Sequence, residues 1–138
     1  MDINSISNQE QITAELGYLI VRVSTALGAI PLENATVTIR GNTKETSGAV
    51  YSMLSDRDGL TKKVSLPAPP RTISEHPGEY VPFSSWNIDV FKEGYVPVSF
   101  GNVPVYSSVV SVQPAVLVPI SENFYVRESY NQSIQPDL

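Results

Sequence analysis

The feature that most constrains the fold is an alternation of apolar and polar residues that recurs along residues 17–120. In "ATVTIRG", Val37 and Ile39 fall on one face of an extended chain and polar residues on the other. In "SSWNIDVF", Trp86 and Ile88 share a face in the same way. Because a period of two residues belongs to a half-buried strand, the pattern predicts a chain built from strands.

About seven such strands, separated by turn signals every 8 to 12 residues, predict an all-β, antiparallel seven-stranded sandwich. Two apolar stretches on either side of the turn at 56–59 predict a hairpin. Proline cannot donate to a sheet ladder. The strands around Pro97, Pro104, Pro114 and Pro119 are therefore expected at edges or bulges.

The length of 138 residues is that of one domain, for which we expect an N-terminal arm (1–16), a sandwich (17–120) and a C-terminal tail (121–138). The net charge of −5 argues against nucleic acid or an anionic membrane as partner. With no cysteine we expect no disulfide, and with no basic-then-apolar leader we expect no signal peptide and a cytoplasmic protein.

Three stretches carry a family resemblance: "GYLIVRVSTALGAIPLENATVTI", "LSDRDGLTKKVSL" and "WNIDVFKEGYVPVSF". Together they resemble the carboxypeptidase regulatory-like domain, a transthyretin-like (prealbumin-like) β-sandwich. More narrowly, "LPAPPR", "SSWNIDVFKEGYVPVSFGNVPVY" and "QPAVLVPI" are similar to the N-terminal segment of clostridial spore cortex-lytic proteins.

The resemblance implies an accessory or scaffold module and no enzyme, mediating protein–protein interaction in a spore or cell-envelope context. It brings no catalytic residue and no cofactor with it. The implied partner is another protein, with peptidoglycan or a peptidoglycan hydrolase as candidates. Two alternatives stay open: a carbohydrate-binding module that recognises peptidoglycan, and a hydrolase built on His76.

The stretch "SDRDGLTKKVSLPAPP" places Asp56 and Asp58 at the first and third positions of a calcium-loop pattern. Such a loop needs a bidentate glutamate at its twelfth position, where this chain has Pro67. We therefore predict no metal site and a turn in which aspartate caps backbone amides and Gly59 adopts a positive φ.

His76 is the only histidine, and it lies in the loop-like "SEHPGEY". General-base catalysis needs a positioned nucleophile and an orienting partner, and the sequence marks neither. We expect an exposed loop histidine and no catalytic residue.

Aromatic residues are the remaining binding candidates, because their faces stack on apolar ring faces. Trp86 has the parity of the core, so the better candidates lie in the preceding loop and in the tail. These are Tyr80, Phe83, Phe124, Tyr125 and Tyr130.

Overall fold

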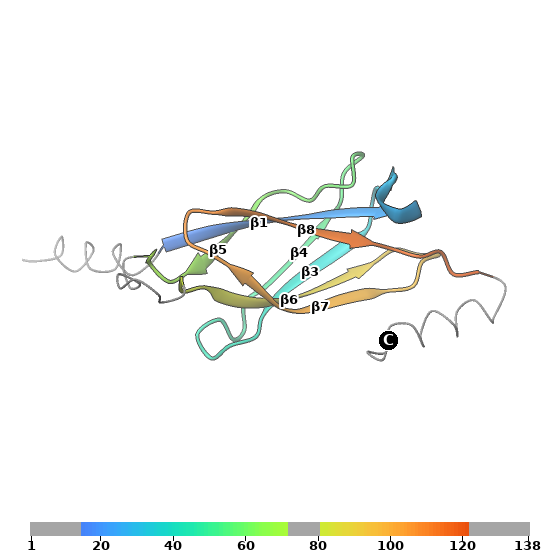
Figure 1. The fold of residues 1–138 in the computed structure, drawn as a ribbon. Coiled ribbons are helices and arrows are strands. Elements are labelled where there is room, and N and C mark those ends of the chain that lie inside the picture. The colour runs from blue at the N-terminus through green and yellow to red at the C-terminus, as the bar shows by residue number, and fades with distance from the viewer. Residues whose placement is uncertain (1–14, 72–80, 122–138) are drawn as a thin grey trace, which may run out of the picture.

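The computed structural model describes residues 15–71 and 81–121, and these form a sandwich of two β-sheets (Figure 1). The first sheet contains β1 (Glu15–Thr25), β2 (Ile30–Pro31), β5 (Val64–Ala68) and β8 (Val110–Val116). The second contains β3 (Thr36–Gly41), β4 (Val50–Leu54), β6 (Ser84–Phe91) and β7 (Val98–Val105). A single turn of 3-10 helix, η1 (Ala26–Gly28), follows β1. The all-β fold class expected from the sequence is confirmed.

The core lies between the two sheets and consists of the inward side chains that the alternation marks. Leu19, Val21 and Val23 of β1 are completely buried, as are Trp86 and Ile88 of β6. Each fully buried side chain of this size is worth about 1.5–3 kcal/mol relative to an exposed one. The periodicity of the sequence therefore identifies both the strands and the face of each strand that is buried in the core.

β1 is the central strand of the first sheet. Its first half pairs antiparallel with β5 and its last two residues pair with β2, while β8 runs parallel to it on the other edge, from Tyr18↔Val110 to Ser24↔Val116. The expectation of a purely antiparallel sandwich is wrong at this pair. Residues 15–71 and 81–121 contain eight strands where seven were expected, since the loop after β1 includes the two-residue β2.

The expected hairpin between β4 and β5 is also wrong, because the turn at 56–59 carries the chain from one sheet to the other. After the turn, Gly59 accepts a hydrogen bond from Val23 N at 2.7 Å, and Thr61 N donates to Val21 O at 3.0 Å. The chain thus joins β1 and not β4. The residues of a turn predict that the chain reverses there, but they do not predict with which strand the following segment pairs.

Within this turn the aspartate has the predicted role. Asp56 Oδ1 accepts hydrogen bonds from Asp58 N at 2.8 Å and Leu60 N at 3.0 Å, and Gly59 has a φ of +82°. A Cβ on Gly59 would stand 2.3 Å from Val23 O, so glycine is required for space as well as for conformation.

Two of the four prolines expected at edges or bulges lie on outer strands, while Pro97 and Pro119 lie outside the named strands. β7, with Pro104, and β8, with Pro114, each end the strand order of their sheet. In β7 the ladder to β6 shifts register between Trp86 and Ile88, and Asn102 takes a positive φ of 58°. The β7 edge is thereby made irregular, which hinders pairing with the strand of another sheet.

The expected arm and tail lie almost wholly outside the residues that the structure describes. Across residues 15–71 and 81–121, no helix is long and apolar enough to span a membrane.

Candidate functional site

A hollow of about 570 Å³ in the described sandwich lies where several segments distant in the sequence meet. Glu15, at the start of β1, contributes to one wall. Thr43, Glu45 and Thr46 contribute from the loop between β3 and β4. The rest of the lining is the end of β5 with the prolines after it (67–70) and the start of β6 (83–85). We call this hollow the end pocket.

A second, more open hollow adjoins the end pocket through a shared residue, Phe83, and is lined also by Arg71, Val81 and Tyr106. The rings of Phe83 and Tyr106 meet edge to face, with centroids 5.6 Å apart and an interplanar angle of 61°. This arrangement is favourable for aromatic pairs. It holds Phe83 in place between the two hollows.

The β3–β4 loop is held by its own hydroxyl groups. Thr46 is buried, and its Oγ1 accepts a hydrogen bond from Thr43 N at 3.1 Å and lies 2.9 Å from Thr43 Oγ1. The preceding Gly41 admits this packing, since a Cβ there would lie 2.0 Å from Thr46 O. The pocket wall is therefore preformed.

Glu15 is held in place by the turn between β7 and β8. The fully buried Ser107 donates its hydroxyl to Glu15 Oε1, and Ser108 N donates to Leu16 O at 2.7 Å. Because Oε1 is held by this hydrogen bond, the orientation of the Glu15 carboxylate is fixed. The carboxylate can accept further hydrogen bonds from a ligand in the pocket.

Among the aromatic candidates, Phe83 is 42% exposed and lines the end pocket. Trp86 is completely buried and belongs to the core, as its parity predicts; its indole N–H donates to Ser84 Oγ at 2.8 Å. The other four candidates lie outside the described residues, as does His76: Tyr80, Phe124, Tyr125 and Tyr130.

The sequence did not point to Glu15, Thr43 or Thr46 as site residues. They are single polar residues in ordinary contexts, and only the fold brings them together. The only part of the pocket lining that stands out in the sequence is the proline run "LPAPP". Consecutive prolines make a stiff, extended segment, and this segment lines the end pocket.

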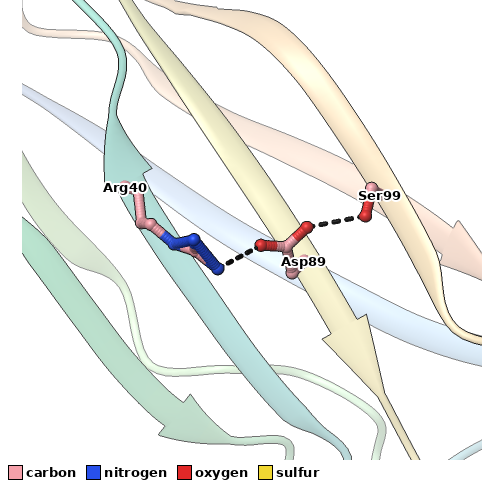
Figure 2. Close-up of polar contacts among 3 residues, drawn as sticks. All are labelled: Arg40, Asp89 and Ser99. Carbon is pink, nitrogen blue, oxygen red and sulfur yellow. Dashed lines mark hydrogen bonds and ion pairs between the residues drawn. The ribbon is translucent and has the colours of Figure 1, made fainter.

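A second polar cluster crosses the outer face of the second sheet (Figure 2). Asp89 of β6 accepts from Arg40 Nη2 of β3 and from Ser99 Oγ of β7, both at 2.6 Å. Arg40 and Asp89 are 52% and 41% exposed, so water screens the pair. The cluster joins three strands and is exposed to solvent, and none of its residues lines the end pocket.

Within 15–71 and 81–121, no group of three or more His, Cys, Asp or Glu side chains is placed to share an ion. Asp56 directs its Oδ1 to backbone amides. A non-haem iron triad of two histidines and a carboxylate needs more histidines than the single one of this chain.

No family model and no curated protein matches the chain. Solved structures do match it in fold. The 3-chlorocatechol 1,2-dioxygenase of Rhodococcus opacus is 10% identical with a TM-score of 0.56 over 80% of this chain. The catechol 1,2-dioxygenase of an Acinetobacter species, inhibited by bound mercury, is 11% identical with a TM-score of 0.54 over 79%. The catechol 1,2-dioxygenase of Acinetobacter radioresistens is 15% identical with a TM-score of 0.53 over 88%.

This chain spans 62%, 54% and 56% of the length of those three proteins. The expectation of a non-enzymatic accessory module, and of no enzyme, is contradicted, because the solved structures that share the fold are enzymes. At such low identity the likeness shows the fold alone. What the chain shares with these dioxygenases is a β-sandwich.

Proposed function

We propose that this chain binds a small, neutral, hydroxylated ring compound in the end pocket. The observation that carries the proposal is the lining of a preformed hollow of about 570 Å³, a volume usual for small-molecule sites. Prolines, Ala68 and Phe83 offer apolar surface, while threonines, serines and two glutamates offer polar groups at its rim.

The polar groups select the ligand by charge. Glu15 and Glu45 present carboxylates that accept hydrogen bonds from hydroxyl groups. The same carboxylates repel an anionic ligand, because like charges placed close together in a partly dry hollow interact strongly. A neutral ring with hydroxyl substituents fits both the apolar wall and the acceptors.

Catechol is a suitable probe, because it is a neutral ring with two hydroxyl groups and is the compound after which proteins that share the fold are named. The proposal concerns binding. No chemical step on the ring is assigned, since the described residues do not fit a metal centre.

Titration of 15N-labelled protein with catechol tests the proposal. Amide shifts are expected first at Thr46, Ala68, Ser84 and Ser85, which line the pocket. Benzoate, a ring with a carboxylate in place of the hydroxyls, is expected to bind more weakly. Shifts that are scattered over the surface, or equal for the two compounds, would contradict the assignment.

A matched pair of variants adds a steric control. Ser85→Phe adds bulk to the pocket lining and is expected to weaken catechol binding. Ser65→Phe places the same ring on an exposed position of β5 that is not part of the lining, and is expected to leave binding unchanged.

We also propose that the sandwich is of the transthyretin-like kind that the sequence resembles. In support, the quoted motif segments fall on β1 and β3, on the turn at 56–59, and on β6 with the corner after it. The two sheets have four strands each.

A further inference from the structure

β4 is an edge strand with none of the features that protect the other edges. It ends the order β4–β3–β6–β7, and its sequence, Val-Tyr-Ser-Met-Leu, has no proline, glycine or charge. The remaining outer strands of the described sandwich each contain a proline: Pro31 in β2, Pro67 in β5, Pro104 in β7 and Pro114 in β8. An unprotected edge is a template for another strand.

Alternate residues of β4 direct their backbone N–H and C=O groups away from β3. Gly41 N donates to Ala49 O at 2.9 Å, and Ser55 N donates to Ala35 O at 3.0 Å. Hydrogen-bonded pairs alternate along an antiparallel ladder, so the odd-numbered residues of β4 face β3. The N–H and C=O groups of Val50, Ser52 and Leu54 therefore point off the free edge.

We propose that this edge pairs with β4 of a second copy of the chain, antiparallel and two-fold symmetric about Ser52. In that register Ser52 lies opposite Ser52 of the partner, and Val50 lies opposite the partner's Leu54. Every outward N–H and C=O of the three residues then finds a partner. A continuous sheet of eight strands results from the two four-stranded sheets.

The side chains are complementary under this symmetry. On the outer face, Val50 and Leu54 are 59% and 58% exposed. In the dimer, Val50 of each copy would be covered by the partner's Leu54. On the inner face, Tyr51 meets the partner's Met53, a favourable contact between a ring and a thioether. Because residue i faces residue 104 − i, Asp56 falls opposite Gly48 and Arg57 opposite Ser47, so no like charges oppose each other.

The assembly stops at two copies. The other end of the same sheet is β7, where Pro104, the positive φ of Asn102 and the register shift to β6 interrupt the edge. A symmetric contact that uses the same strand on both copies leaves no second template, so it closes as a dimer. The contact is small, and a weak, concentration-dependent dimer is expected.

Sedimentation equilibrium of the full chain from about 10 µM to about 1 mM, the affinity range of small transient interfaces, tests the proposal. The average mass is expected to rise from the 15.1 kDa of one chain toward twice that value. Ser52→Lys places two lysines face to face and should abolish the rise, while Ser65→Lys, at an exposed position on β5, should not. A monomer throughout, or equal dimerisation of both variants, overturns the proposal.

Register is tested separately by crosslinking, because the chain has no natural cysteine. Ser52→Cys treated with a short bismaleimide is expected to give a covalent dimer, and Ser65→Cys at the same concentration is expected to stay monomeric. Strong crosslinking through Ser65→Cys with none through Ser52→Cys would show that another edge is used and would overturn the assignment to β4.

Discussion

Ser84 accepts the indole N–H of Trp86, two residues further along β6, at 2.8 Å. Trp86 is completely buried, and Ser84 lines the end pocket. The bond therefore links the only tryptophan of the chain to the wall of the proposed ligand site.

Ser84→Ala is expected to lower the free energy of unfolding by about 1–3 kcal/mol, because it leaves a buried donor without its partner. It should also change the emission of Trp86. Ser85→Ala is the matched control, since Ser85 makes only a long 3.5 Å contact with Asn102. Urea unfolding followed by fluorescence measures both, and equal losses would contradict the structural role of the bond.

Ser55→Ala is expected to cost more than an exposed serine substitution. The buried Ser55 Oγ accepts from Ala35 N at 2.9 Å and donates to Leu32 O at 2.7 Å, so its removal leaves two backbone groups unpaired. A loss of at least about 2 kcal/mol follows from the cost of unpaired groups. Ser65→Ala, on an exposed strand position, should stay within about 0.5 kcal/mol of the natural protein.

Gly59→Ala and Gly48→Ala separate backbone conformation from space. Both glycines have positive φ, at +82° and +87°, but only Gly59 has an atom, Val23 O, within 2.3 Å of the added Cβ. Gly59→Ala should lose more than about 1 kcal/mol, and Gly48→Ala appreciably less. Thermal unfolding of the two variants gives the comparison, and similar midpoints would mean that the turn at 59 relaxes freely.

Calcium is expected to leave the protein unchanged. The turn at 56–59 uses Asp56 Oδ1 for two backbone amides and lacks the bidentate glutamate of a calcium loop. Thermal midpoints measured with a chelator and with millimolar calcium should agree. A rise of several degrees with calcium would reveal a bound ion that stabilises the folded state.

The Arg40–Asp89 pair is expected to contribute less than about 1 kcal/mol, because both side chains are exposed. A double-mutant cycle with Arg40→Ala and Asp89→Ala measures the coupling (Figure 2). The coupling should shrink in molar salt, where charges are screened within about 3 Å. Coupling that persists unchanged in salt would point to a hydrogen-bonding and not an ionic origin.

The strands and their buried faces were predictable from the sequence because the signal is local. Val37, Ile39, Trp86 and Ile88 alternate with polar residues, and all four are completely buried. The outer positions of the strands with Pro104 and Pro114 were predictable for the same reason. Proline has no N–H to donate to a neighbouring strand, whichever sheet it lies in.

Pairing between strands was not predictable in the same way. The segment 56–59 reads as a hairpin turn, yet the strand after it pairs with β1, because the core and not the turn decides which edge is filled. The residues that line the end pocket were not predictable either. Glu15, Thr46 and Phe83 are far apart in the sequence, and no local pattern relates them.

The parallel pairing of β1 with β8 has a consequence for synthesis on the ribosome. The buried bond from Thr25 Oγ1 to Leu117 O joins residues 92 positions apart, so one edge of β1 stays unpaired until β8 has been synthesised. Until residues 110–116 emerge, β1 has no neighbour on that side, and Leu19, Val21 and Val23 lack part of the layer that the last strand completes. Contacts so distant in sequence slow folding. The nascent chain is therefore expected to complete its sandwich only after residues 110–116 have left the ribosome, with β1 accessible to chaperones or to incorrectly paired strands until then.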